Sequence, residues 1–160
     1  MRALRIPADL VGSIRQHARA TYPQECCGYL FAAAEIDRRP GARVITGIEP
    51  ARNEYPGERE RRFEIRPSEL RDVERRIEGT DRLVAGFYHS HPDHPAKPSA
   101  FDEEHAWPWY TYLIVSVTAK GTRAIGAFEL EVDSGRFRAV PLEILPTDVG
   151  TGVSRTPARA

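Results

Sequence analysis

Residues 83–102 read LVAGFYHSHPDHPAKPSAFD and combine an apolar run, a proline-rich stretch and a polar turn. The apolar run from Leu83 to His89 predicts a buried strand. Prolines at positions 92, 95 and 98 predict a stiff loop over residues 93–98. Ser99 is a suitable N-cap for a short helix that reaches about His105. A strand, a rigid loop and a helix therefore follow one another and fix the polar side chains that they carry.

Two histidines, a serine and an aspartate lie in this unit at a defined spacing, H-x-H-x7-S-x2-D. His89 and His91 are two residues apart, so their side chains point to the same side of an extended segment. Asp102, in the first turn of the helix that begins near Ser99, can add an anionic ligand. Three nitrogen or oxygen ligands, with a fourth position left to water, are typical of catalytic zinc. The pattern predicts an open site for one Zn²⁺ per chain.

Glu25 is the candidate for the acid that handles the proton of the water. It stands directly before the apolar run Cys26–Ala33, which predicts a second buried strand. An unpaired carboxylate next to buried surface is costly, and a zinc-bound water would give it a partner. We therefore predict that Glu25 takes the proton of this water and passes it to the leaving amine.

These polar residues and their surroundings resemble the signature of the JAMM (JAB1/MPN/Mov34) zinc metalloprotease family. The likeness covers roughly residues 6–145 and includes YPQECCG at 22–28 and YLIVSV at 112–117. It implies a curved mixed β-sheet flanked by helices, a fold related to that of the cytidine deaminases. It also implies that two histidines and an aspartate bind zinc, that a glutamate is the general acid/base, and that a serine helps to stabilise the oxyanion. The residues at these positions are His89, His91, Asp102, Glu25 and Ser99.

The chain as a whole predicts an α+β, or mixed α/β, architecture, because strands alternate irregularly with three helices. The two longer helices are expected at residues 7–20 and 68–78, where apolar side chains recur on one face. The polar residues 53–60 are expected to form a loop. Further strands are expected at 44–49, 62–65, 110–117, 123–132 and 136–144.

Composition restricts the class of protein. A length of 160 residues with 41% hydrophobic side chains predicts one globular domain over residues 1–145, followed by a disordered tail at 146–160. A formal net charge of zero gives no electrostatic basis for binding nucleic acid or an anionic membrane. No apolar run approaches the roughly 20 residues that span a bilayer. Two adjacent cysteines and no export signal indicate the cytoplasm, and oligomers remain compatible with the sequence.

Several residues near the motif have simpler roles than chemistry. Ser90 should face away from the two histidines and form a structural hydrogen bond. His94 and His105 are expected at the surface rather than on the metal. Cys26 and Cys27 are expected to be buried small hydrophobic residues, since the hard ligands suffice.

Two further groups of residues leave alternatives open. Seven arginines between residues 59 and 76 are interleaved with five acids, which favours local ion pairs on a solvated face over nucleic-acid binding. Trp107 and Trp109 either pack in the core, which is the simpler interpretation, or line a groove for an extended peptide.

The resemblance implies a zinc peptidase or isopeptidase. The chain has no long insertion and is similar to compact prokaryotic members, whose substrates include small β-grasp ubiquitin-like and sulfur-carrier proteins of the ThiS/MoaD type. The predicted reaction is hydrolysis of the bond after the C-terminal Gly-Gly of such a carrier. The alternative is a non-catalytic MPN-type scaffold for protein interactions, against which the complete set of site residues counts. A zinc deaminase is disfavoured, because the chain lacks both the H-x-E and the C-x-x-C that such enzymes carry.

Overall fold

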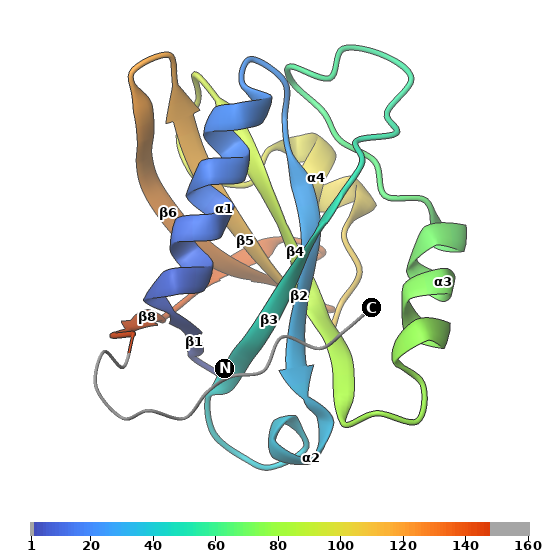
Figure 1. Cartoon of the computed structure of the whole chain (residues 1–160). Helices are drawn as coiled ribbons and strands as arrows, with labels where there is room; N and C mark the ends of the chain where they lie inside the picture. Colours follow the sequence, from blue (N-terminus) through green and yellow to red (C-terminus); the bar gives the residue numbers. More distant parts are fainter. Residues whose placement is uncertain (1, 148–160) are drawn as a thin grey trace.

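The computed structural model describes residues 2–147, in which eight strands form one mixed sheet in the order β7-β6-β5-β4-β2-β3-β1-β8 (Figure 1). Neighbours are parallel in the pairs β1/β3, β1/β8 and β4/β5, and antiparallel elsewhere. The strands are β1 (Leu4–Pro7), β2 (Cys27–Ala33), β3 (Arg43–Ala51), β4 (Arg82–Pro92), β5 (Thr111–Thr118), β6 (Gly121–Leu130), β7 (Phe137–Val140) and β8 (Leu142–Leu145). The helices are α1 (Ala8–Thr21), α2 (Ala34–Asp37), α3 (Pro67–Ile77) and α4 (Ala100–His105).

The sheet is strongly curved. Strands β7 and β8 stand at opposite ends of the strand order, yet Pro141 alone separates them along the chain. The two ends of the sheet must therefore approach each other, and β8 completes the sheet by pairing with β1. This confirms the expected curved mixed sheet flanked by helices.

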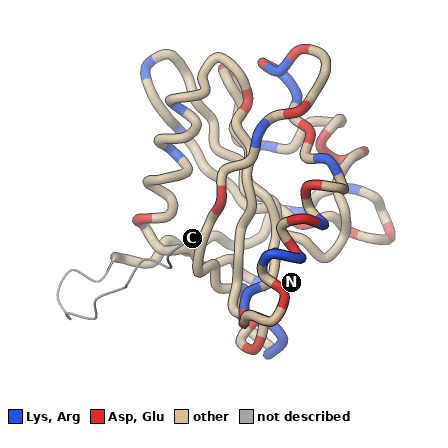
Figure 2. Tube along the Cα trace, turned by 45° about the vertical axis from the view of Figure 1, so that its right-hand side comes forward, with Lys and Arg blue, Asp and Glu red and all other residues tan. Residues whose placement is uncertain are grey.

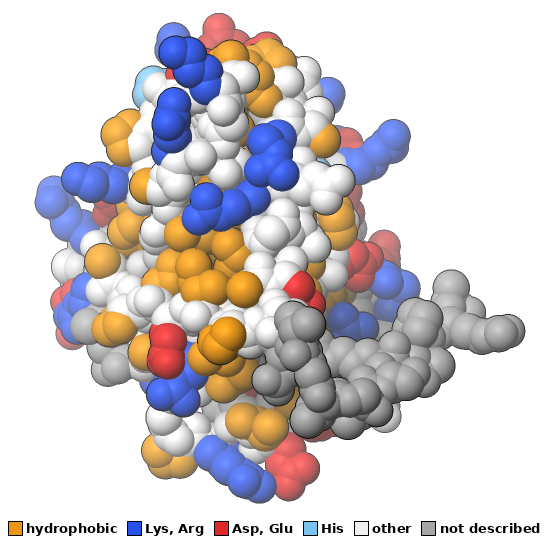
Figure 3. Space-filling view, turned by 60° about the vertical axis from the view of Figure 1, so that its left-hand side comes forward, with side chains coloured by type: hydrophobic (Ala, Val, Ile, Leu, Met, Phe, Trp, Pro, Cys, Tyr) orange, Lys and Arg blue, Asp and Glu red, His pale blue; other side chains and the backbone are white. Residues whose placement is uncertain are grey.

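Helices α1 and α3 cover different faces of the sheet, and the alternation of side chains in β2 explains why. Leu30 packs in the core with Ile14 of α1, whereas Tyr29 and Phe31 pack with Val73 of α3. Successive residues of a strand point to opposite faces, so one apolar strand supplies both cores. The surface on the side of α1 and β6 shows a group of hydrophobic side chains, with Lys and Arg side chains above it (Figure 3).

Strands β4 and β5 approach closely because residue 86 is a glycine. A Cβ atom at Gly86 would overlap the carbonyl oxygen of Thr111 on β5. This close parallel pair is joined by α4, and ligands of such units bind beyond the carboxyl ends of the strands. The two histidines of the motif lie at that end of β4.

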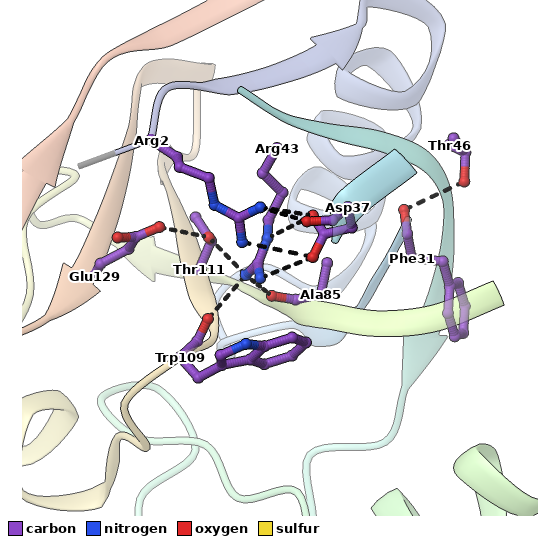
Figure 4. Close-up of polar contacts among 9 residues, drawn as sticks. All are labelled: Arg2, Phe31, Asp37, Arg43, Thr46, Ala85, Trp109, Thr111 and Glu129. Atoms are coloured by element: carbon purple, nitrogen blue, oxygen red, sulfur yellow. Dashed lines mark hydrogen bonds and ion pairs between the residues drawn. The ribbon is translucent and has the colours of Figure 1, made fainter. Parts of the chain in front are cut away.

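Arg43 is the largest fully buried side chain, and the sequence did not predict its burial. Its guanidinium donates to both carboxylate oxygens of Asp37, at 3.0 and 3.2 Å, and to the carbonyls of Ala85 and Trp109, at 2.7 and 2.9 Å (Figure 4). Trp109 has a φ of 81°, uncommon for a bulky residue, and its ring stacks 4.5 Å from the guanidinium. Arg43 thus ties α2 to β4 and to the turn before β5.

The arginines between residues 59 and 76 lie among acids, as expected, and basic and acidic positions alternate along the loop before α3 and along α3 itself (Figure 2). Arg66 pairs with Glu54 at 3.9 Å, and Arg76 pairs with Glu49 at 2.6 Å. Exposed pairs of this kind stabilise a protein only weakly. They do, however, neutralise this face.

Several expected elements were wrong in detail. Residues 62–65 form no strand; they belong to a loop that reaches the site. The strand expected at 136–144 is two strands, because the sheet curls at Pro141. Strand β1 and helix α2 were missed, since both are short and depend on partners distant in sequence. Pro7, expected in the first turn of α1, is instead its N-cap.

Two expectations concern the ends of the chain and the membrane. The tail expected to be disordered lies, from residue 148 onward, outside the described residues. Among residues 2–147, no helix has the length and apolar character needed to cross a bilayer.

Candidate metal centre

The histidine pair lies on the face of β4 that α3 and α4 cover. Phe87, two residues before His89, packs in the core against α3, and His89 and His91 continue the same side of the strand. Ser90 faces the opposite way and accepts a 2.8 Å hydrogen bond from the backbone N–H of Cys26. The structural role expected for Ser90 is therefore confirmed.

The three expected ligand atoms converge on one point. His91 Nε2 lies 3.1 Å from His89 Nε2 and 3.1 Å from Asp102 Oδ2, and His89 Nε2 lies 3.4 Å from the same oxygen. Ligand atoms at the roughly 2.0–2.2 Å bond lengths of tetrahedral zinc lie about 3.3–3.6 Å apart. The three atoms are thus spaced much like three corners of such a tetrahedron.

The protonation of these groups suits a cation. The Nδ1 of His91 lies 2.9 Å from the carbonyl oxygen of Pro95, which can only accept, so Nδ1 carries a proton. The Nε2 of His91 faces Asp102, where it can hold either a proton shared with the carboxylate or a metal ion. Burial lowers the pKa of His89, which favours its neutral form. If both Nε2 atoms were deprotonated, two nitrogen lone pairs and a carboxylate oxygen would repel one another at these distances. A proton or a metal ion between them removes that repulsion, so the residues fit a metal.

The pKa values of Asp102 and His91 are shifted in opposite directions. Burial acts to raise the pKa of Asp102, but His89, His91 and the Ser99 amide outweigh it and hold the pKa well below its usual range. Burial acts to lower the pKa of His91, yet its hydrogen bonds to Asp102 and Pro95 leave the pKa raised. Asp102 is therefore an anion at neutral pH.

Asp102 is held in place by the start of α4. Its Oδ2 accepts a 2.8 Å hydrogen bond from the backbone N–H of Ser99, and its own N–H donates to Ser99 Oγ at 3.1 Å. This reciprocal capping box fixes the first turn of the helix. Ser99 is the N-cap, as expected, and its hydroxyl hydrogen stays free to donate.

Glu25 lies beside the two histidines. Its side chain is buried, its Oε1 is 3.9 Å from His91 Nε2, and among the described residues neither carboxylate oxygen has a hydrogen-bond partner. Burial raises the pKa of Glu25 to about 8. Glu25, His89 and His91 can bring one ligand atom each within 4.8 Å of the others. Asp102 lies nearer to both histidines than Glu25 does, so it is the better third ligand.

Asn53 supports Glu25, a role that no sequence pattern predicted. Its side-chain N–H groups donate to the carbonyls of Glu25, at 3.2 Å, and Arg62, at 2.9 Å. Its side-chain oxygen accepts from the backbone N–H groups of Tyr55, at 3.0 Å, and Glu64, at 3.2 Å. One amide thus joins the strand entrance that carries Glu25 to the loop over the site.

Phe63 is a second residue that sequence reasoning missed. Its ring stacks on His89 at 4.4 Å between centroids, so the loop expected to be a strand covers a candidate ligand. His94 and His105 are exposed, as expected. Cys26 and Cys27 are buried free thiols, and burial raises the pKa of both, for Cys26 to about 11. Such thiols stay protonated at neutral pH and behave as small hydrophobic groups.

Two clefts of different character meet at the candidate metal centre, and Phe101 lines both. The aromatic cleft, of about 660 Å³, reaches His89 and Asp102, and no Lys or Arg lines it. The basic cleft, of about 610 Å³, reaches Glu25 and His91 from the other side. The aromatic cleft is lined by Tyr55, Phe63, Phe87, Phe101, Trp107 and Tyr112, among others, and the basic cleft by Arg61, Arg62 and Lys97, among others.

The tryptophans do not pack in the core. Trp107 is 38% exposed and lines the aromatic cleft, and Trp109 is 56% exposed. The groove interpretation fits Trp107. Core packing, the simpler of the two interpretations, was wrong for both residues.

A mixed curved sheet with a His, His and carboxylate cluster at the carboxyl end of a strand is compatible with a protein that binds a metal ion. Residues 7–129 match the family described as prokaryotic homologs of the JAB domain, and the chain belongs to this family. The expected resemblance to the JAMM family is thereby confirmed.

Similar proteins include two named peptidases. The chain is 38% identical over 145 residues to a desampylase of Haloferax volcanii, covering 88% of this chain and 96% of that protein. It is 36% identical over 112 residues to a CysO-cysteine peptidase of Mycobacterium tuberculosis, covering 69% of this chain and 71% of that protein. A JAB1/MPN domain protein of Archaeoglobus fulgidus shares the fold, with a TM-score of 0.53 and 14% identity over 89% of this chain and 99% of that one. These similarities confirm the expectation of a JAMM-type hydrolase.

Proposed function

We propose that this protein is a zinc peptidase that cleaves the bond after the C-terminal Gly-Gly of a small ubiquitin-like or ThiS/MoaD-type sulfur-carrier protein. The observation that carries the proposal is the convergence of His89 Nε2, His91 Nε2 and Asp102 Oδ2 within 3.4 Å of one another. The unpaired carboxylate of Glu25 beside them supports a catalytic rather than a purely structural site.

The chain's own residues divide the work of hydrolysis. Zn²⁺, when held by the two histidines and Asp102, would polarise the scissile carbonyl and acidify a water. Glu25 takes one proton from the attacking water, whose oxygen forms the new bond to the glycine carbonyl carbon. The C–N bond then breaks, and Glu25 passes the proton to the leaving nitrogen. The products are a carrier that ends in a glycine carboxylate and a free amine.

Ser99 has a second part in this proposal. Its oxygen already accepts from the Asp102 N–H, so its O–H can donate to the carbonyl oxygen as negative charge develops there. The capping box fixes the position of the hydroxyl before substrate binds.

The aromatic cleft supports an extended peptide as substrate, because its rings offer apolar walls leading to the ligand residues. Two relatives named desampylase and CysO-cysteine peptidase support a small protein carrier as the partner. We further propose that residues up to Leu145 act as one domain and work in the cytoplasm, where the two free thiols remain reduced.

The test is intact-mass analysis of ThiS-type carriers extended beyond Gly-Gly, incubated with zinc-loaded protein. We expect cleavage directly after Gly-Gly, lost with a chelator and with Glu25→Gln. Glu78→Gln is the matched control, since Glu78 is an exposed acid that lines neither cleft and should retain activity. Full activity of Glu25→Gln would overturn the mechanism. Absence of cleavage by protein with one zinc per chain would overturn the carrier assignment and require another substrate class for the peptidase.

A further inference from the structure

The two clefts at the candidate metal centre differ in charge as well as in shape. The aromatic cleft is lined by three acids, Glu64, Asp102 and Glu104, and by no Lys or Arg. The basic cleft is lined by three cations, Arg61, Arg62 and Lys97, and by two acids, the exposed Glu60 and the buried Glu25, so cations outnumber acids there. A substrate that crosses the centre therefore meets apolar walls and acids on one side, and positive charge on the other.

Glu25 lines the basic cleft and does not line the aromatic cleft. In the proposed reaction Glu25 delivers its proton to the leaving nitrogen, so this nitrogen must lie on the side of Glu25. The released group then occupies the basic cleft, and the Gly-Gly tail of the carrier occupies the aromatic cleft. This orientation rests on the proposed function. It places the positively charged side chains of the basic cleft next to the released group.

Lys97 is the cation best placed to meet the released group. The loop that presents it is anchored at several points: Ala96 is buried, the carbonyl of Pro95 bonds to His91, and the N–H of Asp93 donates to the Val117 carbonyl at 2.8 Å. Lys97 itself is exposed. An exposed ammonium on a fixed loop can bind an anion without the loop being ordered first.

Arg61 and Arg62 add charge in different ways. Arg62 is fixed to the cleft wall, where it donates to the Tyr55 hydroxyl at 3.0 Å and lies 4.6 Å over the ring of Phe101. Arg61 has only a 3.8 Å pair with Glu58, and both side chains are about three-quarters exposed, at 74% and 76%. Such a pair is weak, so Arg61 is available to a ligand.

We propose that the basic cleft binds the free α-carboxylate of the released group, so that the favoured substrate is a carrier whose terminal glycine is joined to the α-nitrogen of a single amino acid. In an amino acid the carboxyl carbon is two bonds from the nitrogen, so the carboxylate enters the cleft with the leaving amine. In a lysine isopeptide the leaving nitrogen sits at the end of a methylene chain, with no carboxylate near it.

The test compares three substrates that share one ThiS-type carrier. The first ends in Gly-Gly-Cys with a free carboxylate, the second carries a carboxamide there, and the third is an isopeptide to the Nε of a blocked lysine. We expect kcat/KM to be about tenfold higher for the free carboxylate than for the other two, as for a charge-assisted contact in a partly exposed cleft. We expect this advantage to shrink as salt is raised, because salt screens exposed charges.

Variants identify the cation. Lys97→Gln should slow the carboxylate substrate about tenfold and leave the carboxamide unchanged. Lys120→Gln is the matched control, since Lys120 is exposed in the β5–β6 turn and does not line the cleft. The same preference should appear in equilibrium binding to zinc-loaded Glu25→Gln, which does not turn the substrate over.

The outcomes separate this proposal from the function on which it rests. Equal rates for carboxylate and carboxamide with an active wild type would overturn the basic-cleft proposal and leave the peptidase standing. Equal loss on both substrates in Lys97→Gln would overturn the assignment of Lys97. Failure of zinc-loaded wild type to cleave any of the three would overturn the proposed function itself.

Discussion

Glu25 combines deep burial with the lack of any hydrogen-bond partner among the described residues. Burial raises its pKa from 4.5 to about 8, so the folded chain without metal holds a proton that the unfolded chain releases above about pH 4.5. Stability falls with rising pH wherever the folded state binds more protons. Glu25 therefore destabilises the metal-free fold increasingly between pH 4.5 and 8.

Glu25→Gln should accordingly stabilise the metal-free protein at high pH. We expect a gain on the order of 2–4 kcal/mol at pH 8 that fades towards pH 5, measured by urea unfolding in chelator at matched pH values. The difference between variant and wild type isolates Glu25, because other titrating groups are common to both. A gain that does not change with pH would contradict this account.

Asn53 should act on the reaction through Glu25. Asn53→Ala removes four hydrogen bonds, so we expect kcat to fall about tenfold or more, as for other residues that orient site groups, with KM and zinc content little changed. Asn53→Asp keeps the two acceptor contacts to Tyr55 and Glu64 but cannot donate to the Glu25 carbonyl. If Asn53→Asp keeps full kcat, the hydrogen bond from Asn53 to the Glu25 carbonyl does not contribute to the reaction.

At the scale of elements, the close approach of β4 to β5 rests on one missing methyl group. Gly86→Ala should destabilise the protein by about 3 kcal/mol, since the added Cβ meets backbone that cannot move aside. Gly12→Ala is the opposite control: Gly12 lies on the exposed side of α1 with nothing within 4 Å of an added Cβ. Alanine there should stabilise by about 1 kcal/mol. Thermal unfolding of both variants checks the pair.

The elements also show what sequence patterns can and cannot predict. Local periodicity located α1, α3 and the strands that carry Glu25 and the histidines, because their burial repeats within a few residues. It missed β1, whose partners lie in β3 and β8, and it could not predict that Arg43 would be buried with Asp37. The H-x-H spacing brought the ligand candidates together, whereas Asn53 and Phe63 reach them from a loop without periodicity.

At the scale of the whole molecule, the first and last strands depend on each other. Four residues of β1 pair with four of β8, and Arg5 bonds to Glu143 across the pair at 2.8 Å. We expect the amide protons of β1 and β8 that bond across this pair to open with one common free energy in native-state hydrogen exchange. Those between β2 and β4, in the middle of the sheet, should exchange more slowly. Loss of protection in β8 while β1 stays protected would show that the two are independent.

The pairing of β1 with β8 also sets an order of events when the chain is made. Translation delivers β1 first, while β8 is delivered some 135 residues later, as the positions of the two strands require. Until then the outer edge of β1 has no partner, and unpaired strand edges are where chains associate wrongly. The sheet closes only after residue 145 has left the ribosome, so the outer edge of β1 stays unpaired until β8 has been made.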